Sequence, residues 1–230
     1  MADQLKHRGP DSSGEWVDER VGIALGYRRL AIIDVSPTGN QPMVSACGRF
    51  VITLNGEIYN FEDLRRELEA AGWQSPWRGH SDTEVLLAAI SRWGLESALE
   101  KTNGMFAFAL WDRQNRELSL ARDRLGEKPL YYGWNRGVLL FGSELKALLA
   151  HPKVPRNVDP RAVEDYFTFS YVPDPKTIYA GVLKLEPGTY LLGRRGDGLA
   201  PPVRYWDVPL FGDRAIPGTP AQWQQELRDR

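Results

Sequence analysis

The hydrophobic period changes from helical to strand spacing near residue 105, and that change limits the folds this chain can form. Residues 81–93 place apolar side chains at helical spacing on one face. Residues 105–111 and 117–122 instead indicate the two strands of a hairpin, and residues 130–133 and 137–141 indicate two more strands. Because helices and strands form separate runs, the sequence predicts an α+β fold with helices packed on largely antiparallel sheets. The lack of strict strand–helix alternation counts against a Rossmann fold.

Shorter elements flank this centre. Asp159 and Pro160 form a good N-cap and N1 pair for a helix through Tyr166. The composition shifts after Ala150, and residues 151–155 have the Pro-rich character of a linker. The remaining predicted elements are strands at 15–17, 21–25, 29–34 and 49–54, helices near 60–72 and 95–101, a helix that opens at 143, and a helix over 221–230.

Composition excludes several classes of function. The 230 residues suffice for one large domain, or for one domain and part of another. A formal net charge of −1 gives no overall field to attract nucleic acid or an anionic membrane. The single cysteine is typical of a reducing compartment, so we expect a cytoplasmic protein. No run reaches the ~20 apolar residues of a membrane span, and the first residues lack the apolar core of a secretory signal.

The stretch around Asn55 and Gly56 is the first candidate for chemistry. It closes an apolar strand at Leu54, and we predict a turn at Gly56 into a helix. Such a turn leaves backbone N–H groups free beside an Asn side chain that also donates. Preorganised donors of this kind stabilise an oxyanion when an amide or ester is attacked. An ordinary Asn-Gly turn is the simpler interpretation, and the dipeptide alone favours it.

Two charged residues add to this interpretation. Arg29 stands at the head of a predicted strand, where its guanidinium can bind a carboxylate, although a surface Arg on an edge strand fits equally. Asp82 follows Ser81 at a helix start that has the capping-box pattern with Glu84, and it can cap the helix, bind a ligand ammonium, or do both. With the donors at 55–56, these groups would hold an amino acid at both ends and polarise its side-chain carbonyl. That combination describes a glutamine site.

The other polar motifs predict structure. Residues 122–132 pack several charges into the turn after a strand, which indicates an ion-paired structural turn. His7 and His80 pair with nothing at metal-ligand spacing, so we predict no metal site. Neither a Walker-type loop nor a Gly-x-Gly-x-x-Gly loop is present.

Seven motifs in register resemble one known family. The series is similar to the glutamine amidotransferase domain of glutamine-hydrolysing asparagine synthetases, a class II amidotransferase of the N-terminal-nucleophile type. The resemblance covers about residues 5–207, and the combination is far more specific than any one motif. The seven motifs are His7–Asp11, Arg29–Asp34, Asn55–Asn60, Ser81–Glu84, Gly104–Ala109, Arg122–Tyr132 and Ser143–Ala147.

The resemblance implies a four-layer αββα sandwich and three parts of the chain. Residues 1–150 would be the amidotransferase core, residues 151–207 its end and connection, and residues 208–230 the start of a synthetase domain. In the family, ammonia released from glutamine travels to that second domain, where ATP activates aspartate. ATP and Mg would therefore belong to the synthetase domain, and this chain would itself hold no cofactor.

The resemblance also implies residue roles. Arg29 would bind the α-carboxylate of L-glutamine, and Asp82 would bind its α-ammonium group. Asn55 and the backbone N–H of Gly56 would form the oxyanion hole. Glu57 would contact the glutamine, and the stretch Leu30, Ala31, Ile32 and Ile33 would line the site.

Two departures from the family pattern bear on activity. The family nucleophile is a first-residue cysteine in a Met-Cys-Gly-Ile opening, whose free α-amino group acts as the general base. This chain opens Met1-Ala2-Asp3-Gln4, so we expect that the cysteine and the opening strand, which is central in this fold, are missing and that a sheet edge is exposed. Cys47 precedes a strand without an α-amino group of its own and is not expected to replace the nucleophile. The family's Ser-Gly-Gly core for ATP does not occur either.

Three hypotheses follow. The first is a truncated glutamine-hydrolysing asparagine synthetase whose remaining part hydrolyses glutamine at a negligible rate. The second is a non-catalytic binding or interaction module, as in relatives of the β-lactam synthetase type. The third is a sugar- or phosphoribosyl-amidating class II enzyme, which the synthetase-like stretch 159–207 disfavours. The sequence leaves open whether the chain forms a homodimer.

Overall fold

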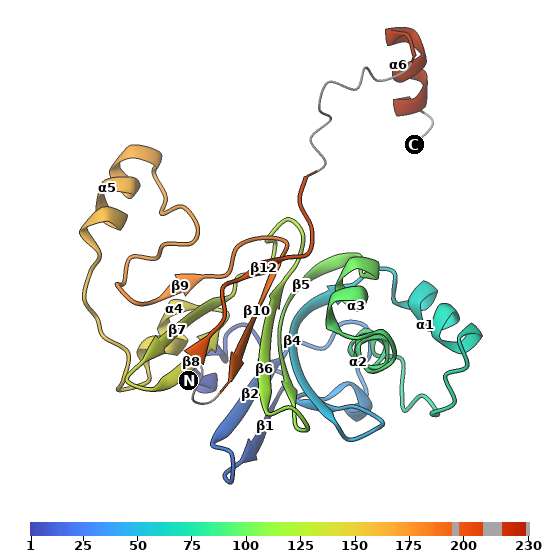
Figure 1. Ribbon diagram of the computed structural model, residues 1–230, viewed down its shortest axis with the longest axis horizontal. Helices are drawn as coiled ribbons and strands as arrows, with labels where there is room; N and C mark the ends of the chain where they lie inside the picture. Colours follow the sequence, from blue (N-terminus) through green and yellow to red (C-terminus); the bar gives the residue numbers. More distant parts are fainter. Residues whose placement is uncertain (195–197, 209–217, 229–230) are drawn as a thin grey trace.

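The computed structural model describes residues 1–194, 198–208 and 218–228 (Figure 1). The helices are η1 (Ala2–Leu5), η2 (Pro37–Gly39), α1 (Phe61–Ala70), α2 (Asp82–Trp93), α3 (Leu95–Lys101), α4 (Leu145–Leu149), α5 (Pro160–Phe169) and α6 (Pro220–Arg228). The strands are β1 (Ser12–Asp18), β2 (Ile23–Arg29), β3 (Met43–Val44), β4 (Phe50–Ile58), β5 (Gly104–Asp112), β6 (Glu117–Arg122), β7 (Tyr131–Asn135), β8 (Val138–Gly142), β9 (Leu183–Lys184), β10 (Thr189–Arg194), β11 (Gly198–Leu199) and β12 (Val203–Arg204).

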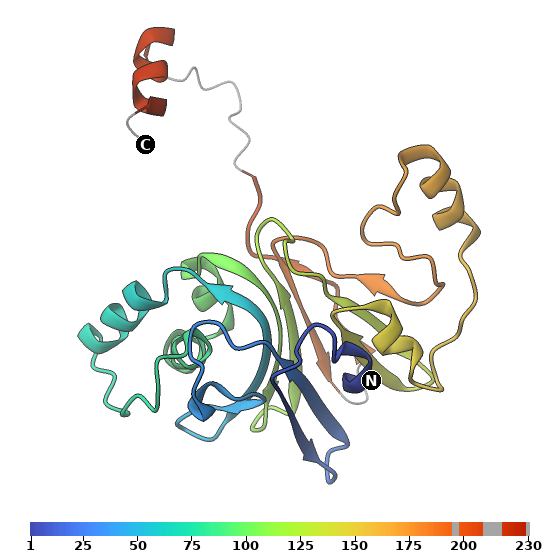
Figure 2. The same cartoon turned by 180° about the vertical axis from the view of Figure 1, so that it is seen from behind.

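One antiparallel sheet forms the centre of the molecule. Its strands follow the order β11-β10-β6-β5-β4-β3, and β12 adds to β10 to make seven. The pairing of β4 with β5 is continuous, from Phe50 opposite Asp112 to Ile58 opposite Gly104. Figure 2 shows α1, α2 and α3 grouped on one side of this sheet. The predicted α+β class with largely antiparallel sheets is therefore confirmed.

The central sheet is buried on both faces because its strands alternate between two apolar clusters. On β4, Ile52 and Leu54 pack toward α1 and α2, whereas Val51 packs with Leu25 of β2 on the opposite face. A smaller cluster joins α4 to β8 through Leu148 and Leu140. The layers thus run helix, sheet, sheet, helix, as the four-layer sandwich requires.

The second sheet layer consists of two separate small sheets. One contains β1 and β2, and the other has the order β8-β7-β9. Within the described part of the chain, β2 pairs only with β1, and β8 pairs only with β7. The free edges of β2 and β8 therefore lie on either side of the cavity described below.

Two predicted elements are wrong in position. The strand expected over 29–34 is absent; Arg29 is the last residue of β2, and an irregular loop follows it. Leu30, Ile32 and Ile33 look like a strand in sequence, yet their side chains are 37–59% exposed, so no burial drives them into a sheet. The predicted turn at Gly56 is likewise absent, because β4 continues to Ile58 and α1 begins only at Phe61.

No helix in the described part of the chain is long and apolar enough to cross a membrane.

Candidate glutamine site

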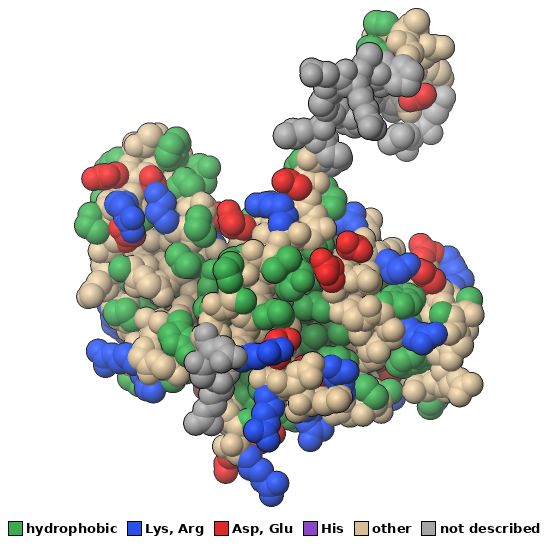
Figure 3. All heavy atoms as spheres, in the orientation of Figure 1, with side chains coloured by type: hydrophobic (Ala, Val, Ile, Leu, Met, Phe, Trp, Pro, Cys, Tyr) green, Lys and Arg blue, Asp and Glu red, His purple; other side chains and the backbone are tan. Residues whose placement is uncertain are grey.

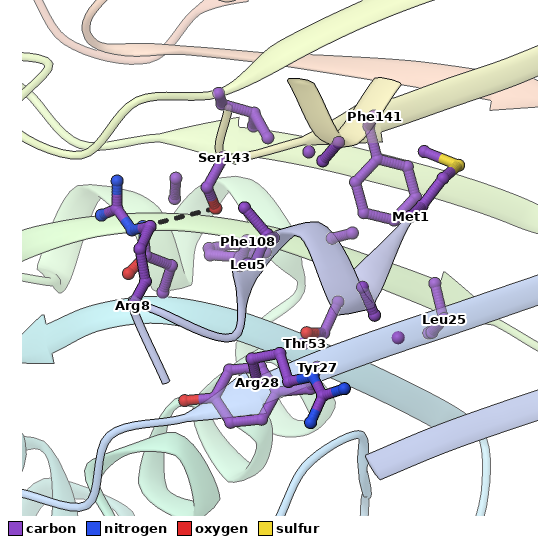
Figure 4. Close-up of a pocket in the computed structure, with 18 of the residues that line it drawn as sticks. Met1, Leu5, Arg8, Leu25, Tyr27, Arg28, Thr53, Phe108, Phe141 and Ser143 are labelled. Atoms are coloured by element: carbon purple, nitrogen blue, oxygen red, sulfur yellow. Dashed lines mark hydrogen bonds between the residues drawn. The ribbon is translucent and has the colours of Figure 1, made fainter. Parts of the chain in front are cut away.

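A cavity of about 490 Å³ lies between the central sheet and the two small sheets (Figure 4). Its floor includes Thr53, Asn55 and Ala107 of β4 and β5. The β2 wall carries Tyr27 and Arg28, while Phe141 and Ser143 lie on the β8 side. Of the predicted site residues, the cavity is lined by Leu30, Ile32, Asn55, Gly56 and Glu57, whereas Arg29, Ala31, Ile33 and Asp82 do not line it.

The backbone N–H of Gly56 lies at an open stretch of the β4 edge. Leu54 N–H donates to Gln41 Oε1 at 2.6 Å, and Ile58 N–H donates to Asp82 Oδ2 at 2.9 Å. Because N–H directions alternate along a strand, Gly56 N–H points the same way as these two and away from β5. Among the residues that the structure describes, it has no acceptor. Gly56 therefore presents a free donor at the cavity.

Asn55 supplies a second donor beside Gly56. Its position in β4 directs its side chain to the cavity face, and Asn55 Nδ2 donates to Ser143 Oγ at 3.5 Å. This long hydrogen bond is the dashed line in Figure 4. A contact at the upper limit of hydrogen-bond length holds the amide only weakly, so a stronger acceptor in the cavity would compete well for it.

Only glycine fits position 56. Its φ of +150° is one that L side chains rarely adopt, and a Cβ would approach the carbonyl oxygen of Met105 to 2.1 Å. The glycine thus allows β4 and β5 to stay in register while the strand twists locally at the cavity. The donor lies at the residues that the sequence singled out, although it belongs to a strand edge and not to a turn.

Arg29 is buried behind the cavity wall, where its guanidinium holds the following loop. Nη1 donates to Ser36 O at 2.9 Å and to Asn40 Oδ1 at 2.7 Å, and Nη2 donates to Asp34 O. A guanidinium has five N–H donors, so two remain for a ligand carboxylate. The residue is 7% exposed.

Asp34 fixes the same loop through its carboxylate. Burial raises its pKa, but hydrogen bonds from the side chain and backbone of Ser36, from Thr38 and from the backbone of His80 outweigh that effect and lower the pKa to about 2. The carboxylate is therefore ionised throughout the neutral range. It ties the loop that follows β2 to the residues just before α2.

Asp82 is the first residue of α2 and lies beneath the end of β4. Oδ2 accepts the Ile58 N–H, and Oδ1 accepts the Thr83 N–H at 2.8 Å. Burial raises the pKa of Asp82; the two backbone hydrogen bonds oppose this rise and the charge of Glu57 adds to it. A nearby cation would relieve this unfavourable burial of charge. The capping prediction is correct for Ser81, but Glu84 accepts from the backbone N–H groups of Arg78 and Gly79 and not from Ser81.

Tyr27 connects the two charged candidates and was missed by sequence reasoning. It lines the cavity from β2. Burial raises the pKa of its hydroxyl, while the charge of Arg29 lowers it and that of Asp82 raises it. Both charges are thus close enough to act on one cavity-lining side chain. Nothing in the sequence marks Tyr27, because only the fold shows which face of β2 meets the cavity.

Two further motifs meet at the rim of the cavity. Glu144 accepts from Arg8 Nη1 at 3.2 Å and lies 3.1 Å from His7 Nε2 and from Lys146 Nζ. Arg8 and Ser143 themselves line the cavity. The first and last of the seven motifs therefore form one ion-pair cluster, although 136 residues separate Arg8 from Glu144.

The turn at residues 122–132 has the structural character that was predicted. Asp123 is fully buried and accepts backbone N–H groups from Phe106, Leu125, Glu127 and Lys128. Arg122 donates to the carbonyls of Gly126, Lys128 and Leu185 and pairs with Asp174. These bonds satisfy the buried charges of Arg122 and Asp123, whereas Lys128 of the same turn lines the cavity.

Cys47 is exposed and lies in the turn between β3 and β4. Its thiol contacts the hydroxyls of Ser45 and Ser91, and it does not line the cavity. Among the described residues, no group of three or more His, Cys, Asp and Glu side chains is placed to hold a metal ion.

Comparison with known proteins places the chain in a family. The family model described as "Glutamine amidotransferase domain" matches residues 1–206. Asparagine synthetase [glutamine-hydrolyzing] 3 of Bacillus subtilis is 42% identical over 213 residues, which are 90% of this chain and 33% of that protein. Asparagine synthetase [glutamine-hydrolyzing] 1 of the same organism is 44% identical over 192 residues, 82% of this chain and 29% of that protein. The chain thus spans about a third of the length of these relatives.

A solved structure shares the fold. The glutamine phosphoribosylpyrophosphate amidotransferase of Bacillus subtilis superposes with a TM-score of 0.54 at 24% identity, covering 80% of this chain and 35% of that one. At this identity the likeness supports the architecture and not a shared substrate. The family match over nearly the whole chain, together with the layered fold and the donor pair at the cavity, shows that this chain belongs to the glutamine amidotransferase domain family.

Proposed function

We propose that this chain is the glutamine-binding domain of a glutamine-hydrolysing asparagine synthetase. The observation that carries this proposal is the pair of donors at one cavity, the free Gly56 N–H and the weakly held Asn55 Nδ2. A side-chain amide placed there would accept both donors through its carbonyl oxygen. Two hydrogen bonds would then stabilise the negative charge that develops on that oxygen when the amide is attacked.

The charged groups behind the wall would fix the amino-acid end of glutamine. Arg29 keeps two N–H donors beyond those that hold its loop, and Asp82 is a buried carboxylate without a cationic partner among the described residues. The charges of Arg29 and Asp82 both influence the pKa of Tyr27, which lines the cavity. Opposite charges that both act on one cavity-lining tyrosine would suit a zwitterionic ligand, and Glu57 adds a carboxylate at the cavity itself.

The donors alone do not hydrolyse an amide. Hydrolysis requires a nucleophile at the carbonyl carbon, and the chain's one thiol, Cys47, lies outside the cavity. We therefore expect glutamine binding with negligible ammonia release from this polypeptide. In the longer parent protein, released ammonia would serve the ATP- and Mg-dependent amidation of aspartate in the synthetase domain.

Calorimetry with L-glutamine tests this proposal when it is paired with an ammonia assay on the same preparation. Saturable binding that Asn55→Ala weakens, without ammonia release, is the expected result. Binding of glutamate or asparagine with equal affinity, or no binding of glutamine, would contradict it. Ammonia release at a rate typical of enzymes would refute the inactivity of the chain.

A binding or interaction module without catalysis is the second candidate. The position of Cys47 outside the cavity favours it for this chain. The two candidates make different predictions for the longer parent protein. If the domain is a non-catalytic module, that protein makes no ammonia from glutamine. A variant that carries a Met-Cys-Gly-Ile opening ahead of Ala2 separates the two, because only a glutaminase domain would then show activity.

A further inference from the structure

Residues 155–182 form an arm that projects from the sheets and returns to them at β9 (Leu183–Lys184), with α5 at its tip (Figures 1 and 2). Four aromatic side chains on this arm are exposed, namely Tyr166 (53%), Phe167 (83%), Phe169 (55%) and Tyr171 (60%). We call these four residues the aromatic face. Single exposed apolar side chains are ordinary, but four within six residues form a patch of the kind that marks an interaction site.

The arm is ordered by its own contacts. Asp159 caps α5 by accepting the Arg161 N–H at 3.0 Å, and its own N–H donates to Ile178 O at 3.0 Å. Ala162 is fully buried, and Val158 bridges Tyr179. These contacts cover the first half of α5 and leave the apolar stripe of its second half uncovered.

The base of the arm is fixed to the central sheet. Asp174 pairs with Arg122 at the end of β6 at 3.1 Å and with Lys184 at 3.1 Å. Lys184 lies in β9, which pairs with β7. The aromatic face is therefore held out at a defined place by ion pairs within the body of the protein.

Four charged groups of the arm are paired with one another. Arg161 binds Asp159, and Lys176 binds Asp165. A partner would thus meet aromatic rings beside neutralised charges, and contact with it would be driven by apolar burial. The exposed part of the four rings supplies on the order of 500 Å², which is most of one partner's share of a standard interface.

The surface beside the arm extends this patch toward the point where the chain leaves the sheet. Leu183 of β9 is 37% exposed and Val203 of β12 is 40% exposed. Figure 3 shows hydrophobic side chains on the arm and on the surface between the arm and the C-terminal segment. Figures 1 and 2 both place residues 203–208 on the side of the molecule from which the arm projects.

We propose that the aromatic face is a docking surface. Its partner is the synthetase portion that follows the matched region in proteins as long as the relatives. This inference rests on the proposed function. The relatives are about three times as long as the region they share with this chain. A polypeptide that continues from the side where β12 ends would emerge beside the arm. It would bury the aromatic face without crossing the cavity, which lies between the sheets.

The test adds the synthetase portion in trans to the full 230-residue chain. The probe is the part of Asparagine synthetase [glutamine-hydrolyzing] 3 of Bacillus subtilis that follows the matched region, shown to be folded by its binding of Mg-ATP. We expect a saturable interaction in biolayer interferometry that Phe167→Asp weakens at least tenfold. The matched control is Trp134→Asp on β7, an exposed aromatic outside the arm, which should change the affinity less than twofold.

Several outcomes would overturn the inference. A folded probe that does not bind, or equal effects of Phe167→Asp and Trp134→Asp, removes the aromatic face as a docking surface. A concentration-dependent dimer in light scattering that Phe167→Asp abolishes would assign the surface to a second copy instead. Glutamine calorimetry on the same variants separates this inference from the proposed function, because Phe167 lies outside the cavity and its substitution should leave glutamine affinity unchanged.

Discussion

Asp82 and Ile58 join α2 to the strand that carries the candidate oxyanion donors, because Asp82 Oδ2 accepts the Ile58 N–H at 2.9 Å. Ile58 is two residues beyond Gly56 on the same strand edge. The carboxylate that would face a ligand ammonium is thus also the group that ends the open stretch of β4. One side chain therefore contributes both to the ligand site and to the placement of the Gly56 donor.

The buried charge of Asp82 predicts a pH dependence of glutamine binding. Burial raises the pKa of Asp82, so the neutral acid is favoured in the free protein at a less acidic pH than for an ordinary aspartate. A ligand ammonium favours the ionised form, and affinity should therefore fall as the pH is lowered through that raised pKa. Isothermal titrations between pH 4 and pH 8 would measure this. Asp82→Asn should bind at least tenfold more weakly at pH 7 and lose the dependence; an unchanged profile would show that another group titrates.

Arg29→Lys should weaken both the loop and the ligand site. A lysine ammonium cannot reproduce the three hydrogen bonds to the loop and still present a fork to a carboxylate. We expect the free energy of unfolding to fall by about 1–3 kcal/mol and glutamine affinity to fall at least tenfold. Arg113→Lys is the control, since Arg113 is exposed and, within the described part of the chain, its side chain donates a hydrogen bond only to the Gly48 carbonyl. Equal behaviour of the two variants would place glutamine elsewhere.

Gly56→Ala should be severely destabilising. The new Cβ would lie 2.1 Å from Met105 O and 2.7 Å from Phe106 Cα, which are backbone atoms of the paired strand. We expect a loss of about 3 kcal/mol or more in urea denaturation, because both the positive φ and the clash act. Gly72→Ala is the matched comparison, since it has φ +84° with open space around the Cβ, and it should cost about 1 kcal/mol. Similar losses at both positions would mean that β4 and β5 separate easily.

Acid should release the loop after β2 through Asp34. The folded-state pKa of about 2 lies below the ordinary value of 3.8, so the carboxylate contributes stability above pH 3.8 that is lost as the pH falls toward 2. After allowance for solvent screening this contribution is about 1 kcal/mol. Asp34→Asn should reduce stability by that amount at pH 7 and by nearly nothing at pH 2, as measured by chemical denaturation. A constant difference at both pH values would contradict the assignment.

Local patterns predicted most of the fold. The helix over 95–101 has the predicted bounds, and α2 begins directly after the predicted cap at Ser81. Both follow from apolar spacing and capping chemistry, which are local in sequence. The stretch 29–34 was predicted as a strand because its residues favour β structure, but whether a strand forms depends on a neighbour to pair with, and here that loop is instead held by Arg29 and Asp34.

The site was only partly accessible from sequence. Asn55, Gly56 and Asp82 stand out because their residue types are informative at strand ends and helix starts. Tyr27 does not stand out, and Ser143 stands out only as part of a family motif, since their places at the site depend on which strand face meets the cavity. The aromatic face of the arm has the same limitation: its residues are ordinary aromatics in sequence, and only the folded chain shows how exposed they are.

Arg122 joins two parts of the molecule. Its guanidinium binds Asp174 at the base of the arm and also the carbonyl of Lys128, a residue that lines the cavity. One planar side chain therefore contacts both the base of the arm and a residue of the cavity wall, so replacing Arg122 would remove hydrogen bonds at both places at once.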